Sequence, residues 1–213
     1  DRSPSRGLGD VYKRQAETCP QYLLLDDSVY AKPDFQGAVY VCAPPIRKKE
    51  DQDCLWEALS REDIQTVATD QCSFTLAQKA LGKDDFTKIP GGLPGVQTRG
   101  TLLYTYGVKE GRITQEQMCK LLSENPAKLY GVYPQKGVLA PESDADIVVL
   151  DPEKESVISA ATHAYNTDNN PFEGFRLRCG IDKVFLRGNL AVDDGQLVKE
   201  KLGKYIARGK KQM

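Results

Sequence analysis

The sequence predicts an α/β fold built on a parallel sheet or on a segment of an α/β barrel. Two short apolar runs, Val39–Cys42 and Ile64–Ala68, have the length and composition of buried strands. A stretch with helical character follows each run, Asp51–Arg61 after the first and Thr75–Leu81 after the second. Strand, helix, strand, helix in this order indicates a βαβ unit, whose strands run parallel.

Composition limits the class of protein. The chain has 213 residues, is 40% hydrophobic and carries 29 Lys+Arg against 30 Asp+Glu, which is enough for one good core or two small ones. This charge balance does not indicate a nucleic-acid partner. Because no run reaches the roughly 18 apolar residues of a membrane helix, and the start has no hydrophobic signal segment, we expect no membrane partner and a cytoplasmic location.

Cysteine and histidine usage bears on metal binding. The six cysteines are scattered without CxxC pairs, so we expect buried, reduced thiols rather than disulfides or a zinc site. The chain has one histidine, His163, which we expect at the surface or in an interface. A metal site made only from this chain would therefore lack its usual imidazole ligands.

The two ends of the chain differ from its body. Residues Asp1–Gln15 are polar, rich in Gly, Ser and Arg, and without apolar periodicity, so we expect a non-native or disordered leader. The body starts abruptly at Ala16, and the chain is expected to be the C-terminal part of a longer protein. The basic tail, Lys199–Met213, is expected to be solvated and partly disordered.

Asp70 is the main candidate functional residue. It follows the strand predicted at Ile64–Ala68, so its carboxylate lies at the C-terminal edge of a parallel strand. In α/β barrels the loops at that edge form the active site, where a carboxylate can bind a metal or transfer protons. The alternative is that Asp70 caps the helix predicted at Thr75–Leu81, and the motif alone favours the cap.

Two proline- and glycine-rich turns accompany this strand. Ala43–Arg47 contains two successive prolines, which make a rigid turn whose remaining N–H and C=O groups can be held pointing outward. Gly91–Gly95 predicts a turn before a helix that starts near Val96, and it is no phosphate loop because no Lys-Ser/Thr follows the glycines. The helix between them, Asp51–Arg61, is amphipathic, with Cys54, Leu55, Ala58 and Leu59 on one side.

The rest of the chain predicts scaffold. Thr114 and Gln117 have capping-box spacing, and Asn125-Pro126 is expected to break the helix that they start. Short strands with turn signals between them are predicted at Ala145–Asp151, Ser156–Ala160 and Lys183–Arg187, followed by the turn Asp193-Asp194-Gly195.

Four motifs in this order resemble one protein family. They are AETCPQYL at 16–23, CAPPIR at 42–47, ATDQCSF at 68–74 and FTKIPGGLPGVQTR at 86–99. The series is similar to the second half of the hydantoinases and dihydropyrimidinases, cyclic amidohydrolases of the metal-dependent amidohydrolase superfamily. The resemblance runs from about Ala16 through Val198.

The resemblance implies an architecture and a metal site. Residues 16–140 would be the C-terminal part of a TIM-like (β/α)8 barrel, and 141–198 a connecting segment and part of a small flanking β-sandwich. The family holds two divalent metal ions, usually zinc, at the barrel's C-terminal face. Asp70 is the one family ligand that can be placed here, and the others would lie upstream of Ala16. A full-length member would be a homo-oligomer, expected to be a tetramer.

The same resemblance assigns roles to three residues. Asp70 would be a metal ligand and would serve as general base and then as general acid, accepting a proton from the attacking hydroxide and passing it to the departing amide nitrogen. Backbone groups of Ala43 and Pro94 would bind the substrate. The chain has Gln71 where the family usually has His, and Ala43 where it commonly has Ser.

The implied function is hydrolysis of cyclic amides such as dihydropyrimidines or 5-substituted hydantoins, with this chain inactive alone. The alternative, from another class, is a non-catalytic dihydropyrimidinase-like protein used for binding or assembly. Metal ligands in the upstream sequence would favour the enzyme, and substituted ligands the binding protein.

Overall fold

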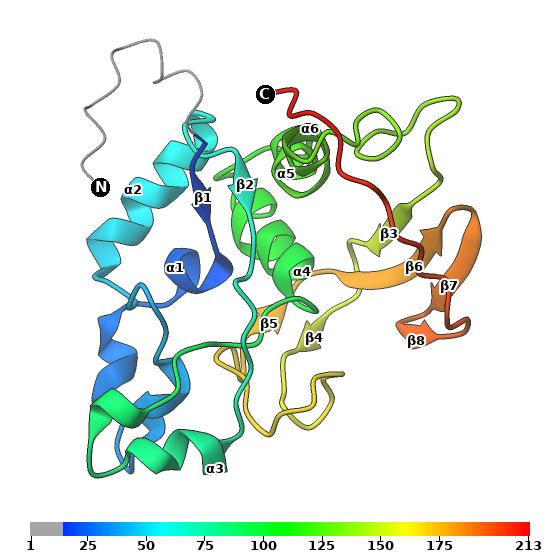
Figure 1. The fold of residues 1–213 in the computed structure, drawn as a ribbon. Coiled ribbons are helices and arrows are strands. Elements are labelled where there is room, and N and C mark those ends of the chain that lie inside the picture. Colours follow the sequence, from blue (N-terminus) through cyan, green and yellow to red (C-terminus); the bar gives the residue numbers. More distant parts are fainter. Residues whose placement is uncertain (1–14) are drawn as a thin grey trace.

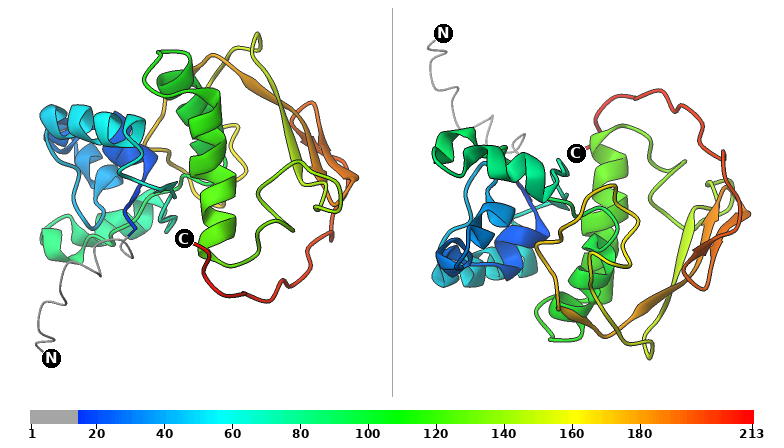
Figure 2. Two further views of the ribbon diagram at one scale, coloured as in Figure 1. Left: turned by 90° about the horizontal axis from the view of Figure 1, so that it is seen from above. Right: turned by 90° about the horizontal axis from the view of Figure 1, so that it is seen from below.

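The computed structural model describes residues 15–213 and divides them into a helical half and a β half (Figure 1). The leader predicted for residues 1–15 lies outside this part except for Gln15. Figure 2 shows the helices α4 to α6 standing between the N-terminal helices and the C-terminal antiparallel sheet. Within residues 15–213, no helix is long and apolar enough to cross a membrane.

The helical half contains a parallel strand pair, of which only the second strand is one that the sequence predicts. Strand β1 (Glu17–Thr18) runs parallel to β2 (Thr66–Val67), with Thr18 opposite Val67. Strand β2 lies inside the predicted strand Ile64–Ala68, and a single parallel bridge joins Gln71 to Leu93 beyond it. Residues 15–213 therefore form only a short parallel sheet and not a closed barrel.

Helices surround this pair. The α-helices are α1 (Pro20–Leu24), α2 (Lys49–Ser60), α3 (Leu76–Lys79), α4 (Arg99–Leu103), α5 (Gln115–Cys119) and α6 (Asn125–Leu129). Four 3-10 helices span Asp27–Ala31, Gln36–Tyr40, Ala80–Gly82 and Phe86–Lys88, and two π-helical turns span Tyr104–Val108 and Lys120–Glu124.

The strand predicted at Val39–Cys42 is wrong. A 3-10 helix, Gln36–Tyr40, occupies its first half, and Phe35 starts it in the left-handed region with φ 64°. The carbonyl of Val41 accepts the Gly92 N–H instead of pairing with a neighbouring strand. An apolar run that finds no partner strand does not stay extended, because its β preference depends on its neighbours.

Helix α2 confirms the helix predicted at Asp51–Arg61, but its buried face differs from the predicted one. Gln52, Trp56 and Leu59 are buried, whereas Cys54 is exposed. Positions two residues apart point to nearly opposite sides of a helix, so Cys54 faces away from the Gln52–Trp56 side. Leu55 and Ala58 are half-buried at the margin of this face.

Asn125-Pro126 does not break its helix. The Thr114–Gln117 capping box is confirmed at the start of α5, and the chain stays helical through the π-helical turn Lys120–Glu124 into α6. Pro126 follows the π-helical turn directly, and the helix continues through it although proline has no amide hydrogen to donate.

The β half confirms the predicted strands and their turn. An antiparallel sheet has the order β3 (Ile147–Asp151), β6 (Gly180–Leu186), β7 (Asn189–Asp193) and β8 (Gln196–Leu197). A separate pair joins β4 (Ser156–Val157) to β5 (Arg176–Leu177). Asp194 and Gly195 connect β7 to β8 with positive φ at both residues, as the favoured two-residue hairpin turn requires. No second sheet packs face to face on these four strands within residues 15–213.

Two apolar clusters hold the helical half together. The first lies under β2 and α2 and consists of Leu23, Trp56, Leu59, Ile64, Val67, Leu103, Ile113 and Leu121. The second joins the N-terminal helices to the β4–β5 region and consists of Leu25, Val29, Tyr40, Ile46, Leu102, Ile158, Phe172 and Leu177.

The basic tail and the cysteines also depart from expectation. The tail has no helix or strand, but Gly209 N–H donates to the Tyr130 carbonyl and Gln212 N–H to that of Lys128. These carbonyls lie at the C-terminal end of α6, and the two bonds from the tail anchor it there, although the Lys128 carbonyl also accepts the Gly131 N–H. The cysteines are all free; Cys19 and Cys179 are buried, Cys42 is half-buried, and the other three are exposed.

Candidate active site

Asp70 lies on the surface just beyond the end of β2. Its backbone has φ 49°, a left-handed conformation that few residues other than glycine adopt and that Asp tolerates better than most. The helix that follows is capped by Thr75, whose hydroxyl accepts the Gln78 N–H. The sequence motif alone favoured Asp70 as the helix cap, and this interpretation is wrong. The exposed carboxylate is therefore free of a capping role.

Buried polar side chains fix the end of β2 below Asp70. The Gln21 amide, in a buried residue of α1, donates to the Thr69 carbonyl at 3.3 Å. The Arg99 guanidinium donates to the Val67 carbonyl at 3.2 Å. Gly95 packs so closely here that a Cβ would lie 3.3 Å from the Thr69 side chain. Together these contacts hold the strand end that carries Asp70.

The proline turn lies close to Asp70. The Tyr22 hydroxyl donates to the Pro44 carbonyl at 2.9 Å, and the Ile46 N–H donates to the Tyr30 hydroxyl at 2.8 Å, so both sides of the turn are held. Burial raises the pKa of Tyr22 and of Cys42, and the negative charge of Asp70 contributes to both increases. The carboxylate is therefore near enough to act electrostatically on the turn that carries Ala43, which is itself exposed.

The glycine-rich loop is bound to the segment that follows Asp70. The Gln71 side-chain oxygen accepts the N–H groups of Gly95 and Val96 at 3.2 and 2.9 Å. Cys72 N–H donates to the Leu93 carbonyl at 3.1 Å. Pro94, between these contacts, is buried.

Glycine is required at one point of this loop. Gly92 has φ 147°, and a Cβ at this residue would lie 2.3 Å from the Cys72 carbonyl oxygen. A side chain would therefore clash with backbone that cannot move out of the way cheaply.

A buried lysine joins the proline turn to the glycine-rich loop. Lys79 on α3 is 1% exposed, and its ammonium donates to the carbonyls of Val41, Pro90 and Gly92 at 3.1, 2.8 and 3.1 Å. Burial lowers its pKa to about 8, while Cys42 and Cys72 oppose that shift. Sequence reasoning missed Lys79, because a lysine in the last turn of a short polar helix is ordinarily a surface residue.

The three predicted residues are thus carried by segments that hydrogen bonds tie to one another. Asp70 follows β2, Ala43 lies in the proline turn, and Pro94 lies in the glycine-rich loop. His163 is not among them: its ring nitrogens contact the Thr167 carbonyl and the Asn170 amide. Its expected surface position is correct in part, since it is half-buried.

A two-metal site does not fit the residues described. Nowhere in residues 15–213 do three or more His, Cys, Asp or Glu side chains come together in a way that could hold a metal ion. Asp70 offers one carboxylate, a suitable donor for a divalent cation, but in the described part of the chain it belongs to no group of three or more such side chains.

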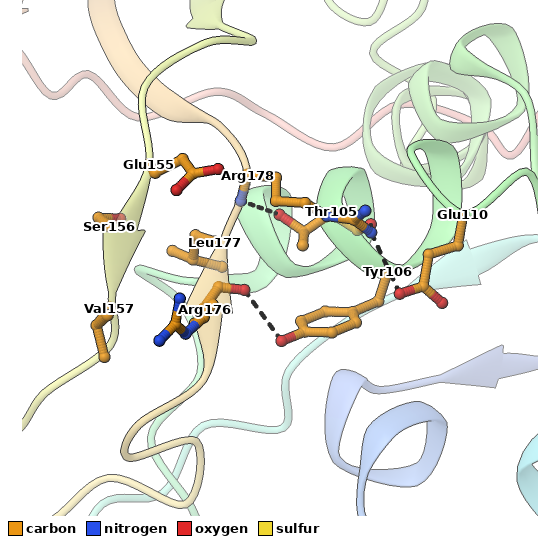
Figure 3. Close-up of a pocket in the computed structure, with 9 residues that line it drawn as sticks. All are labelled: Thr105, Tyr106, Glu110, Glu155, Ser156, Val157, Arg176, Leu177 and Arg178. Carbon is orange, nitrogen blue, oxygen red and sulfur yellow. Dashed lines mark hydrogen bonds and ion pairs between the residues drawn. The ribbon is translucent and has the colours of Figure 1, made fainter.

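One cavity lies away from Asp70. It measures about 440 Å³ and is lined by Thr105, Tyr106, Glu110, Glu155, Ser156, Val157, Arg176, Leu177 and Arg178 (Figure 3). Much of its polar wall is already paired: Arg178 bonds to Glu110 and to the Thr105 carbonyl, and the Tyr106 hydroxyl donates to the Arg176 carbonyl. It shares no lining residue with the loops around Asp70, so we treat it as a gap between packed elements.

Comparison with known proteins identifies the family to which the chain is similar. The sequence pattern of the amidohydrolase family matches residues 27–191. The D-hydantoinase of Geobacillus stearothermophilus is 48% identical over 196 residues, covering 91% of this chain and 42% of that protein. The D-phenylhydantoinase of Escherichia coli is 42% identical over 215 residues, covering 96% and 46%.

Solved structures of related proteins are similar to this chain as well. The crystal structure of the dihydropyrimidinase from Brevibacillus agri superposes with a TM-score of 0.85 at 48% identity, covering 86% of this chain and 40% of that one. The chain spans about two fifths of the length of the curated relatives it matches. Its α/β fold matches that part of the hydantoinase structures. With its family pattern over most of its length, the chain belongs to the amidohydrolase family.

Proposed function

We propose that this chain carries one side of the active site of a hydrolase that opens cyclic amide rings. The observation that carries the proposal is the exposed Asp70 carboxylate at the end of a parallel strand, fixed in a left-handed backbone and flanked by two tied loops. Relatives named D-hydantoinase and D-phenylhydantoinase support this reaction class. The substrates would be small cyclic amides such as dihydropyrimidines or 5-substituted hydantoins.

Asp70 would move the proton. Hydrolysis of a ring amide requires a base that takes a proton from water and an acid that gives a proton to the departing nitrogen. One carboxylate can do both in sequence, provided that it reaches the reacting atoms. Within residues 15–213 the Asp70 side chain forms no hydrogen bond or ion pair, so its oxygens can accept a proton from water.

Backbone groups would hold the ring. Ala43 has a backbone N–H, whereas Pro44 and Pro45, which follow it, have none. The Ala43 N–H is therefore a single fixed donor of this exposed turn. Pro94 keeps a carbonyl that can accept an imide N–H. Because both contacts use the main chain, side-chain changes at these two residues would leave them largely intact.

The resemblance implies two divalent metal ions, usually zinc, in the whole protein, and we propose Asp70 as one of their ligands. Asp70 alone cannot hold them, so we assign no step of the reaction to them from these residues. The finer assignments are proposed with the function: 16–140 as part of a TIM-like barrel, 141–198 as connecting segment and sandwich, a tetrameric whole protein, and a cytoplasmic location.

The test is a chimera in which residues 16–213 follow the first part of the Geobacillus stearothermophilus D-hydantoinase, up to the residue aligned with Ala16. We expect the chimera to open dihydrouracil or a 5-substituted hydantoin, measured by loss of ring absorbance. The 213-residue chain alone should show neither turnover nor tight binding of two metal ions, because it supplies one carboxylate ligand.

Three results would count against the proposal. Turnover by the chain alone, abolished in Asp70→Asn, would show that the site is complete without further ligands. A folded, metal-loaded chimera with no turnover of any cyclic amide would contradict the enzyme assignment and favour the binding or assembly protein. Equal turnover in the chimera and its Asp70→Asn variant would remove Asp70 from the site.

A further inference from the structure

The Lys79 ammonium is placed where it can fix the distance between two loops. Its three N–H groups are matched by three carbonyl acceptors, which satisfies the full donor capacity of a lysine. Val41 lies two residues before Ala43, and Gly92 lies two residues before Pro94. One side chain therefore bonds directly to both of the loops whose backbone groups are proposed to bind substrate.

Apart from Lys79, few contacts join the proline turn to the glycine-rich loop. The Gly92 N–H donates to the Val41 carbonyl at 2.9 Å, so that one oxygen accepts from both Gly92 and Lys79. Gly91 comes within 3.8 Å of the Cys42 backbone, measured from the position of its missing Cβ. Each of these is a single contact, whereas the Lys79 ammonium makes three hydrogen bonds to the two loops.

Burial of the Lys79 ammonium costs desolvation free energy, which its hydrogen bonds must offset. No carboxylate forms an ion pair with Lys79 among the salt bridges of residues 15–213; the aromatic face of Phe74, 5.6 Å away, and three carbonyl dipoles surround the charge instead. A methionine would fill the same space without burying a charge, but it would leave the Pro90 and Gly92 carbonyls without this donor. The charge is thus not needed for packing, and its geometry indicates another role.

Lys79 is unsuited to react with substrate. A nucleophilic or basic lysine needs an unprotonated nitrogen that reaches the reacting atoms. The Lys79 ammonium has all of its N–H groups directed at backbone oxygens, and the side chain is 1% exposed. It touches loops and not the space in front of Asp70.

We propose that Lys79 is a positioning residue that sets the spacing between the Ala43 and Pro94 backbone groups, and thereby the binding of the substrate ring. The inference rests on the proposed function. Loss of the ammonium would let the two loops separate while leaving the Asp70 strand end, which is held by Gln21 and Arg99, in place.

The experiment compares Lys79→Met with Lys83→Met in the chimera. Lys83 is exposed and lies four residues further on, so its replacement is the matched control. We expect KM to rise by about tenfold to a hundredfold in Lys79→Met while kcat changes by less than about threefold, since misplaced binding groups mainly weaken binding. Lys83→Met should leave both constants unchanged. Lys79→Arg, which keeps charge and donors, should recover part of the loss.

Hydrogen exchange separates this inference from the proposed function. In Lys79→Met the amides of Gly92 and Cys72 should exchange faster than in Lys83→Met, whether or not the chimera turns over cyclic amides. If exchange is unchanged and KM is native, Lys79 is only a packing residue and the inference fails. If Lys79→Met does not fold, Lys79→Gln decides: a side-chain amide has two N–H donors for three carbonyls, so a native KM together with native exchange in Lys79→Gln contradicts the inference. An inactive parent chimera contradicts the proposed function. The exchange rates of the Gly92 and Cys72 amides then still test whether Lys79 joins the two loops.

Discussion

The loops around Asp70 and the C-terminal antiparallel sheet are held in place by different means. Strands β3 and β6 pair over five residues of β3 through a main-chain ladder with one bulge between Val149 and Leu150, and their positions follow from hydrogen bonds that any sequence can make. The parallel strands β1 and β2 have only two residues each, and the loops beyond them are tied by side chains to main-chain groups. Regular pairing tolerates substitution, whereas the loops depend on a few residues that cannot be exchanged.

The largest test of this difference is Asp70→Ala in the chimera, compared with Ala43→Ser. Loss of the carboxylate removes the proton transfer step, which is worth about 10²–10⁴ in rate. Ala43→Ser restores the residue that the family commonly has, without moving the backbone, so kcat/KM should stay within about twofold of the parent. Measuring kcat/KM with metal content in parallel shows whether a loss comes from chemistry or from metal. A near-native rate in Asp70→Ala would end the site assignment.

The same difference explains what the sequence could predict. The strands β3 and β6 and the Asp194-Gly195 turn follow from β-branched runs and a turn dipeptide, which are local signals. Strand β2 and Asp70 at its end follow from a local signal as well. These elements were predicted correctly because nothing distant overrides them.

The rest of the site could not be predicted from local pattern. Val39–Cys42 has strand composition, but its Val41 carbonyl is taken by Gly92 and Lys79, fifty-odd and nearly forty residues away by numbering, so no strand forms. The capping role moved from Asp70 to Thr75 because Gln78 completes a capping box there. A buried lysine gives no sequence signal, since its burial is decided by carbonyls that distant loops supply.

The next test concerns Gln71, which joins the Asp70 segment to the glycine-rich loop. Gln71→Leu would leave the Gly95 and Val96 N–H groups without their acceptor; because the Val96 contact is exposed and the Gly95 contact partly buried, we expect the cost to lie near about 1 kcal/mol. We expect kcat/KM to fall by about tenfold, because the Pro94 carbonyl lies next to the freed amides. Gln115→Leu, at an exposed position of α5, is the control.

Gln71→His gives a second reading of the same contact. An imidazole can supply one acceptor nitrogen, so this change to the usual family residue should retain more activity than Gln71→Leu. If Gln71→Leu is as active as the Gln115→Leu control, the glycine-rich loop does not need this tie. The loops would then tolerate substitution as the sheet does, and the proposed difference between the two regions would be wrong.

The smallest expected effect lies in the sheet itself. Gly195 has φ 74° in the β7–β8 turn, and a Cβ there would meet no other atom, so Gly195→Ala tests backbone conformation alone. We expect the chimera to lose about 1 kcal/mol of unfolding free energy, measured by denaturant titration. Its kcat/KM should be unchanged, because the ladder that places the sheet does not pass through the loops at Asp70. Gly203→Ala, in the tail, has ordinary φ and open space, and should change neither quantity. A loss of kcat/KM in Gly195→Ala without a loss of stability would mean that the two regions are coupled.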